Sequence, residues 1–263
     1  MSSSPPILSQ KHYEAPSAFT APNLLREARR QKSLAGASVP AVCVLDPDGD
    51  IVRRLKADGR ARLDFGWACY HTELHRFDDR GIELGIIGCA VGAPFAVLVA
   101  EELFASGCQF LISVTSAGRL TAPGPCFVLI DRALRDEGTS YHYLPAAEFS
   151  HANARLLDLM SKAFARLRVP VERGATWTTD APFRETAEAI AAMREKRLLA
   201  VEMEAAALYA FAQARRKPVL CFAHVTNQMA RVEGDFEKGE ADGTTDALAV
   251  VRAATAAWSA ARL

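Results

Sequence analysis

The chain has 263 residues, of which 50% are hydrophobic and 24% are charged, and its 31 basic and 31 acidic residues give a formal net charge of zero. A chain of this length can bury a full core, whereas a protein that binds nucleic acid or a membrane surface needs a basic excess that is missing here. No apolar run reaches the length of a membrane span.

The first twenty residues are rich in Ser and Pro and contain no apolar core of signal-peptide length. We expect residues 1–20 to form an extension that is partly disordered or lies on the surface. Residues 21–263 are expected to form one domain, because no repeat, linker or break in composition interrupts them. The six cysteines are scattered without a Cys-x-x-Cys pair, which is typical of reduced, buried thiols in a cytoplasmic protein and not of a disulfide framework or zinc site.

Short apolar segments punctuated by Gly or Pro alternate along the chain with longer amphipathic segments. The short segments predict strands at residues 41–45, 83–89, 109–115, 126–131, 174–178 and 218–225. The longer segments predict helices at residues 23–31, 50–57, 94–106, 151–167, 184–196, 202–215 and 244–261. Strands that alternate with helices in this way predict an α/β domain with a central, mostly parallel or mixed sheet flanked by helices.

In such folds ligands bind where the carboxyl ends of strands lead into loops, and two of these loops are rich in small residues. Gly88, Gly92 and Pro94 make a tight turn into a predicted helix, where the backbone is open to a ligand and the helix N-terminus favours an anion. Residues 115–118, Thr-Ser-Ala-Gly, follow a buried strand and offer hydroxyl and N–H donors to a phosphate or a sugar. Each turn taken singly is equally compatible with an ordinary strand-to-helix connection.

Two carboxylates, Glu202 and Glu204, bracket Met203 at the start of an alanine-rich helix. Acids in a first helical turn interact favourably with the helix dipole, by about 0.3–1 kcal/mol each. One acid is enough for that purpose, and methionine is an unusual residue for a solvated turn. A carboxylate accepts two hydrogen bonds at once, which suits the neighbouring hydroxyls of a ribose.

These segments together resemble the nucleoside phosphorylase family of purine nucleoside and uridine phosphorylases. Residues 201–207 are similar to its Glu-Met-Glu signature, residues 88–94 to its Ser-Thr-Gly-x-Gly-Gly-Pro turn, and residues 111–118 to its Ile-Arg-x-Gly-Thr-x-Gly loop. Asp46-Pro47 resembles its Gly-Asp-Pro-x-Arg loop, and the matches occur in the family's order. The resemblance implies a single α/β domain assembled as a homodimer or homohexamer, with a nucleoside and inorganic phosphate as its small-molecule partners and no cofactor or metal.

The resemblance also implies roles for the three residues of the signature. Met203 and Glu204 would hold the ribose, with Glu204 on its 2′- and 3′-hydroxyls as a catalytic group. Contacts to these hydroxyls tighten as positive charge develops on the sugar, which lowers the barrier by several kcal/mol. Glu202 would be either a second ribose contact or a helix cap, and the residues themselves favour neither.

The implied phosphate site consists of Gly92 and Ser116, with Thr115 beside them. The family's arginines are missing, because Ser113 and Gly49 stand at their positions, and with them the bidentate contacts to phosphate. Substitutes are available within the chain at Arg53, Arg54, Arg60, Arg62 and Arg119 or from a partner subunit. Alternatively, water replaces phosphate and the protein is a nucleosidase, or it binds nucleosides without turnover, as storage proteins with this fold do.

The base is implied to bind against residues 176–186, where Phe183 would stack on it and Arg184 would donate to its carbonyl oxygens. The alternative for Arg184 is a solvated position in the next helix, and Asp180 and Trp177 are expected to have structural roles. Purine-cleaving members carry an aspartate after the following strand as general acid. Asn227 stands there, and an amide can bind a base but cannot deliver a proton at neutral pH.

Asn227 therefore favours uridine-like pyrimidine nucleosides, whose base can depart with its charge on the carbonyl oxygens O2 and O4. The resulting hypothesis is a pentosyl transferase that cleaves nucleosides by phosphorolysis, with Glu204 and Asn227 as its catalytic residues.

Overall fold

The computed structural model of the chain describes residues 5–121, 127–165, 167–227, 238 and 240–261. Cys126, the first residue of one predicted strand, lies outside these ranges. The strands are β1 (Val42–Asp46), β2 (Ala61–Leu63), β3 (His75–Asp79), β4 (Ile82–Gly88), β5 (Phe110–Arg119), β6 (Phe127–Asp136), β7 (Phe149–His151), β8 (Val171–Thr179), β9 (Ala200–Glu202) and β10 (Val219–Asn227). The helices are α1 (Ala21–Lys32), α2 (Asp50–Ala57), α3 (Ala93–Ala105), α4 (Ala154–Phe164), α5 (Ala187–Glu195), α6 (Ala205–Arg215) and α7 (Thr244–Ala261).

All ten strands belong to one mixed sheet, in the order β10-β6-β8-β9-β5-β1-β4-β3-β2, with β7 paired to β6. The strand β5 pairs with β1 and β10 in parallel and with β9 in the antiparallel sense. Because β10 pairs with both β6 and β5, the strands β5, β9, β8, β6 and β10 close into a ring. The remaining strands β1, β4, β3 and β2 extend from this ring as an open sheet, and the predicted α/β class is confirmed.

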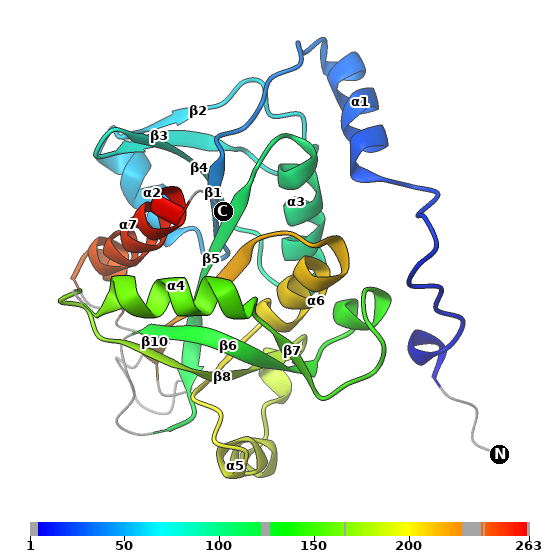
Figure 1. Ribbon diagram of the computed structural model, residues 1–263, viewed down its shortest axis with the longest axis vertical. Helices are drawn as coiled ribbons and strands as arrows, with labels where there is room; N and C mark the ends of the chain where they lie inside the picture. Colours follow the sequence, from blue (N-terminus) through cyan, green and yellow to red (C-terminus); the bar gives the residue numbers. More distant parts are fainter. Residues whose placement is uncertain (1–4, 122–126, 166, 228–237, 239, 262–263) are drawn as a thin grey trace.

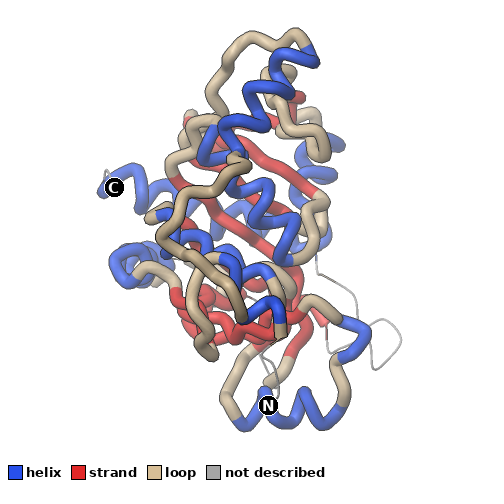
Figure 2. Tube along the Cα trace, turned by 90° about the vertical axis from the view of Figure 1, so that its right-hand side faces the viewer, coloured by secondary structure: helices blue, strands red, loops and turns tan. Residues whose placement is uncertain are grey.

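Helices cover both faces of the strands. Figure 1 shows α2, α4 and α7 on one side and α1, α3 and α6 on the other, with α5 at the lower end. Within these layers α4 and α2 pack against α7, and α3 packs against α6. Figure 2 shows the strands as a twisted band that runs through the molecule between the helices. Among the described residues, no helix is long and apolar enough to cross a membrane.

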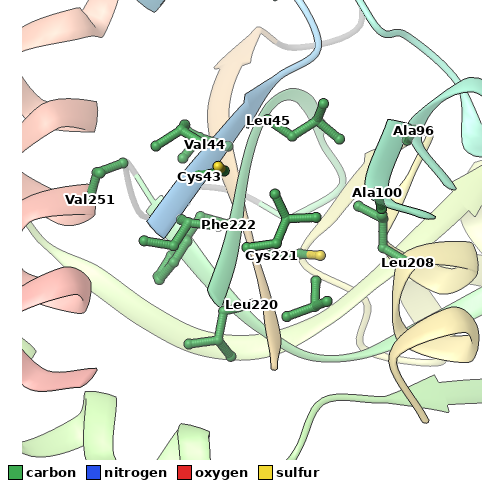
Figure 3. Close-up of a cluster of buried hydrophobic side chains, with 14 of the residues drawn as sticks. Cys43, Val44, Leu45, Ala96, Ala100, Leu208, Leu220, Cys221, Phe222 and Val251 are labelled. Carbon is green, nitrogen blue, oxygen red and sulfur yellow. The ribbon is translucent and has the colours of Figure 1, made fainter. Parts of the chain in front are cut away.

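Burial on both faces explains why the central strands are almost continuously apolar. In β10, Leu220 and Phe222 point toward Val251 of α7, whereas Cys221 between them points toward the layer of α3 and α6 (Figure 3). The helix α6 is buried along Ala205–Phe211, and its small alanines let it approach the sheet closely. A helix enclosed on all sides is expected to be apolar all round, as this one is.

The structure corrects several boundaries. Glu202 ends the short strand β9, and α6 begins only at Ala205, so the predicted start of this helix at residue 202 was wrong. His151 pairs with β6 as part of β7, so α4 starts at Ala154 and not at residue 151. Arg184 lies in a separate 3₁₀ turn, η3 (Pro182–Arg184), and not in α5. Strands β2, β3, β7 and β9 had not been predicted, because three of them have only three residues and β3 is mostly charged.

Residues 5–20 lie along the surface beside the 3₁₀ turn η2 (Thr139–His142) (Figure 1). The Tyr13 hydroxyl donates to the Tyr141 carbonyl at 3.3 Å, and Lys11 Nζ lies 2.9 Å from His142 Nδ1. These contacts hold the described part of the extension, residues 5–20, against the surface.

Candidate active site

The junction between β9 and α6 buries the carboxylate of Glu204 against two other loops. Glu204 is 1% exposed, its Oε1 accepts a hydrogen bond from the Gly92 N–H at 2.7 Å, and its Oε2 accepts one from the Thr115 hydroxyl at 2.9 Å. Gly92 has φ = 92°, a backbone conformation that favours glycine. The sequence signature therefore places one carboxylate where α3, β5 and α6 meet.

Burial, together with the nearby charge of Glu202, raises the pKa of Glu204 to about 8. Because this folded-state pKa lies above the ordinary 4.5, the protonated group stabilises the fold at low pH, and that stability is lost as the pH rises to about 8. Asp46, whose pKa burial raises to about 7, acts in the same direction.

We expect the free energy of unfolding to fall by a few kcal/mol between about pH 5 and pH 8.5. Urea denaturation across this range measures the slope, and Glu204→Gln should flatten it because the amide does not titrate. A wild-type stability that rises toward pH 8.5, or an unchanged slope in the variant, would contradict this assignment.

Glu202 has a different environment, which favours the capping role over a ribose contact. Its Oε2 accepts hydrogen bonds from the backbone N–H groups of Glu204 at 2.8 Å and Ala205 at 2.7 Å, at the start of α6. Its Oε1 accepts from the hydroxyls of Thr176 and Thr178. Four donors thus saturate a fully buried carboxylate, and Glu202 holds the backbone that carries Glu204.

Replacing Glu202 with alanine should leave two hydroxyls and two N–H groups buried without their acceptor. Each such group costs about 1–3 kcal/mol in the worst case, and partial relaxation leaves an expected loss of about 3 kcal/mol in the free energy of unfolding. The exposed Glu195→Ala is the matched control, with an expected change within about 0.5 kcal/mol. Chemical denaturation measures both, and equal effects in the two variants would rule out the capping role.

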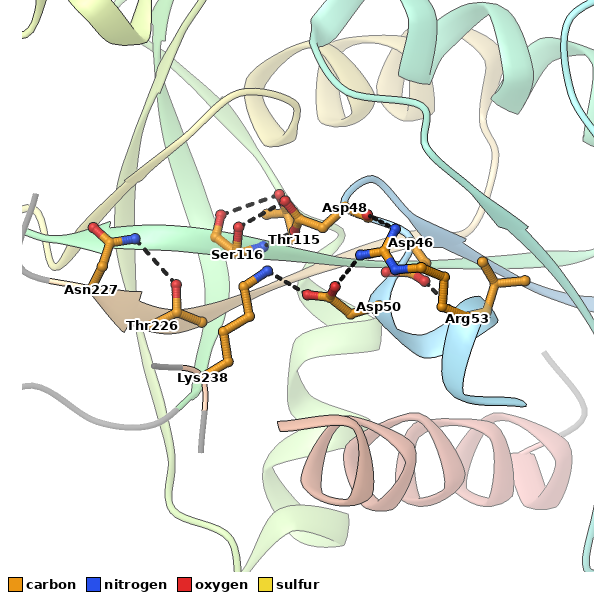
Figure 4. Close-up of polar contacts among 10 residues, drawn as sticks. Asp46, Asp48, Asp50, Arg53, Thr115, Ser116, Thr226, Asn227 and Lys238 are labelled. Atoms are coloured by element: carbon orange, nitrogen blue, oxygen red, sulfur yellow. Dashed lines mark hydrogen bonds and ion pairs between the residues drawn. The ribbon is translucent and has the colours of Figure 1, made fainter. Parts of the chain in front are cut away.

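The segment from the end of β1 to the start of α2 carries three acidic residues, and one of them, Asp48, accepts hydrogen bonds from both donors of Ser116. Asp48 Oδ2 accepts from the Ser116 N–H at 2.7 Å, and Asp48 Oδ1 accepts from the Ser116 hydroxyl at 2.9 Å (Figure 4). Asp46 caps α2 by accepting from the Val52 N–H at 2.9 Å. Asp50 is paired with Arg53 and Lys238. A carboxylate of the protein therefore takes the place in which the sequence predicts a phosphate.

The space beside this contact is small and mostly acidic. A cavity of about 20 Å³ adjoins Asp48 and Ser116, which is room for about one water molecule. Its charged and titratable lining consists of Asp46, Asp48, Asp50, Asp242, His224 and Lys238. His224 stacks on Phe127 with ring centroids 4.5 Å apart, and burial lowers its pKa, so its imidazole is neutral at neutral pH. The acidic side chains outnumber the one ammonium of this lining, which disfavours a phosphate dianion.

Comparison with known proteins identifies the family to which the chain belongs. Residues 42–262 match the family model described as the phosphorylase superfamily. The chain belongs to the phosphorylase superfamily. Its expected membership of a family of nucleoside-cleaving pentosyltransferases, with nucleosidase relatives, is thereby confirmed.

Two curated relatives of this phosphorylase-superfamily protein are themselves phosphorylases. The guanosine phosphorylase of Halorubrum lacusprofundi is 29% identical over 168 residues, which cover 62% of this chain and 67% of that protein. The DeoD-type purine nucleoside phosphorylase of Brevibacillus brevis is 25% identical over 154 residues, which cover 57% of this chain and 66% of that protein. The chain thus spans about two thirds of the length of each.

Solved structures confirm the fold. Uridine phosphorylase from Vibrio fischeri superposes with a TM-score of 0.69 at 22% identity, over 82% of this chain and 90% of that one. The 5′-methylthioadenosine/S-adenosylhomocysteine nucleosidase of Campylobacter jejuni has a TM-score of 0.68 at 16% identity, over 82% and 98%. The same superfamily fold therefore carries both phosphorolytic and hydrolytic enzymes.

The groups predicted to donate hydrogen bonds to phosphate donate them to carboxylates of this phosphorylase-superfamily protein. Gly92 and Thr115 hold Glu204, and Ser116 holds Asp48. Of the arginines considered as substitutes, four face carboxylates: Arg53 faces Asp50, Arg54 Asp58, Arg60 Asp79 and Arg62 Glu83. Arg119 at the end of β5 has no ion pair within the described part of the chain, and its Nε is buried without a hydrogen bond there.

The predicted base-binding residues are divided between the end of β10 and the turn η3. Asn227 ends β10, pairs with Gly118 in the register, and donates from Nδ2 to the Thr226 hydroxyl at 3.2 Å. It therefore lies on the strand next to the one that supplies Thr115 and Ser116. Phe183 is 98% exposed on η3, and Arg184 beside it is also exposed. Their binding of a base stays a prediction that requires the base to meet them at the surface.

The two residues expected to be structural have such contacts in the structure. The Asp180 carboxylate accepts from the Gly138 N–H at 2.8 Å, and Trp177 is buried with its indole N–H donating to Asp136 at 2.9 Å. Met203 is half-buried between Glu202 and Glu204. In the described ranges, no group of three or more His, Cys, Asp or Glu side chains is placed to hold a metal ion.

Asp48 is the residue that sequence reasoning missed. The signal was present, because an Asp-Pro-Asp loop followed the first predicted strand. In this loop the resemblance points to a glycine and an arginine, which are missing, and says nothing of the carboxylate at Asp48.

Proposed function

We propose that this protein cleaves the N-glycosidic bond of a nucleoside and that water is the nucleophile, which makes it a nucleosidase. The observation that carries the choice of nucleophile is the Asp48 carboxylate on both donors of Ser116, at 2.7 and 2.9 Å. An anion already held there repels a second one, and the adjoining cavity of about 20 Å³ is sized for water.

Glu204 supplies the sugar-binding part of the mechanism. Its two oxygens are oriented by Gly92 and Thr115, and each retains lone pairs that can accept a ribose hydroxyl. As the bond to the base stretches, positive charge develops on the sugar and these contacts strengthen. Glu202 acts through Glu204, because its hydrogen bonds fix the backbone of the junction.

Asp48 acts as general base toward the attacking water. The oxygen of water bonds to C1′ while the bond from C1′ to the base nitrogen breaks, and the proton lost by water goes to Asp48. The electron pair of the broken bond leaves with the base, which then takes up a proton. One nucleoside and one water thereby give one free sugar and one free base.

Asn227 supports a uridine-like pyrimidine substrate. Its amide can donate to a base oxygen that gains negative charge, but it cannot protonate a purine nitrogen at neutral pH. The half-buried position of Asn227 beside the β5 loop is consistent with such a contact.

Phosphorolysis is the second candidate, and Arg119 is the residue that favours it. This guanidinium has no carboxylate partner within the described residues and follows Ser116 by three positions. The names of the two curated relatives also support it. In that case phosphate must displace Asp48 from Ser116 before it can bind.

One assay separates these functions. The protein is incubated with uridine, cytidine, guanosine and adenosine, with and without phosphate, and free base, free ribose and ribose 1-phosphate are quantified. We expect uracil and free ribose at equal rates with and without phosphate. Release that requires phosphate and yields ribose 1-phosphate would establish the second candidate, and nucleoside binding without any release would leave a binding protein.

A further inference from the structure

A second cavity lies at the opposite end of the elements that build the candidate active site. Its volume is about 500 Å³, within the range of small-molecule sites. It is formed where β7 leads into α4, where α6 ends, and where β10 begins, and β7 packs against α6 (Figure 1). Both α6 and β10 run from this cavity to the candidate site, a distance on the order of 20 Å.

The charged side chains that line this cavity are all basic. Arg155, Arg216 and Lys217 line it together with His151, and no Asp or Glu belongs to its lining. None of the three cations has an ion-pair partner among the described residues, although many other arginines of the chain do. The Lys217 ammonium lies over the Phe104 ring, 5.3 Å from its centroid. In a chain with zero net charge, the three side chains are a local concentration of positive charge without ion pairs among the described residues.

The floor of the cavity is apolar, which indicates what else the ligand contains. Leu156, Ala212, Pro218 and Val219 form it, and Leu156 and Val219 are buried. Cations above an apolar floor suit a molecule that joins an anionic group to a ring of low polarity. The first N–H groups of α4 already donate to Asn153, so the side chains supply the attraction.

Arg216 is the cation of this cavity that can be removed with the least disturbance of the backbone. It stands at the C-cap of α6 with φ = 53° and ψ = 48°, a left-handed conformation in which glycine is the favoured residue.

We propose that this cavity binds a small organic monophosphate, with the phosphate on Arg155, Arg216 and Lys217 and the ring on the apolar floor. The planar guanidinium groups match the oxygens of a phosphate in bidentate geometry. The site is separate from the candidate active site and does not depend on which nucleophile that site uses.

Isothermal titration calorimetry with uridine 5′-monophosphate, guanosine 5′-monophosphate and phenyl phosphate tests this proposal. The decisive variant is Arg216→Gly, which removes a cation while giving the C-cap its preferred residue, so the fold is retained. Arg197→Gly is the matched control, because Arg197 also has a left-handed backbone, with φ = 60°, and does not line the cavity. We expect at least tenfold weaker binding in Arg216→Gly and unchanged binding in Arg197→Gly and Glu204→Gln.

Three results would overturn the proposal. The first is that none of the monophosphates binds to the wild-type protein. The second is equal affinity in wild type and Arg216→Gly, or a loss in Glu204→Gln, which would move the binding to the candidate active site. The third is that inorganic phosphate binds as tightly as the monophosphates, which would leave the apolar floor without a role.

Discussion

Replacing Glu204 with glutamine is expected to slow base release from a nucleoside by about a hundredfold to a thousandfold. Hydrogen bonds to the ribose hydroxyls that tighten in the transition state are worth several kcal/mol, and each 1.36 kcal/mol is a factor of about ten in rate. The neutral amide can still accept from Gly92, so the junction keeps its shape while one accepting oxygen is replaced by an NH2 group. Steady-state kinetics measure kcat/KM, and calorimetry measures nucleoside affinity.

The control for this variant is Glu195→Gln, which removes a carboxylate from an exposed position at the end of α5. Its kcat/KM should equal that of the wild type. If Glu204→Gln also keeps the wild-type kcat/KM and nucleoside affinity, Glu204 does not contact the sugar. The effect depends neither on the identity of the nucleophile nor on that of the base.

Asp48→Asn should lower phosphate-free base release by about a hundredfold to ten-thousandfold, the usual contribution of a positioned general base. Asp48→Ala should in addition release the N–H and hydroxyl of Ser116, so that base release becomes dependent on added phosphate. Product analysis in both variants, with and without phosphate, measures these two changes separately.

Asp50→Asn is the matched control, since Asp50 lies two residues further along, at the start of α2, and pairs with Arg53 and Lys238 and not with Ser116. We expect it to change the rate far less than Asp48→Asn. Wild-type rates in phosphate-free Asp48→Asn would exclude a general base at this position. If the wild-type protein requires phosphate and Asp48→Asn binds phosphate more tightly, the carboxylate competes with phosphate instead of activating water.

Much of the fold was predictable from short-range patterns. Alternating apolar segments predicted six of the ten strands and all seven helices to within a few residues. The missed strand β9 shows the limit, because three residues, Ala200–Glu202, are too few to establish a period of two. Its pairing with β8 and β5 depends on contacts between residues far apart in the chain.

The candidate site was predictable in its components but not in its hydrogen bonds. The Glu-Met-Glu signature and the two small-residue loops do meet, as the order of the motifs predicts. The pairing of carboxylates with hydrogen-bond donors is a property of the folded chain. Glu204 accepts from Gly92 and Thr115, and Asp48 accepts from Ser116. A sequence match assigns ligand donors by position and cannot reveal that a side chain of the same protein has taken them.

Thr115 and Ser116 are neighbours on β5, and their side chains serve different partners. Thr115 orients the carboxylate assigned to the sugar, and Ser116 holds the carboxylate assigned to the nucleophile. One peptide unit separates the residue that holds Glu204 from the residue that holds Asp48. The backbone of β5 thus sets the distance between the two carboxyl groups. A substitution confined to residues 46–50 is therefore expected to alter the contact with Ser116 while leaving the hydrogen bonds of Glu204 to Gly92 and Thr115 in place.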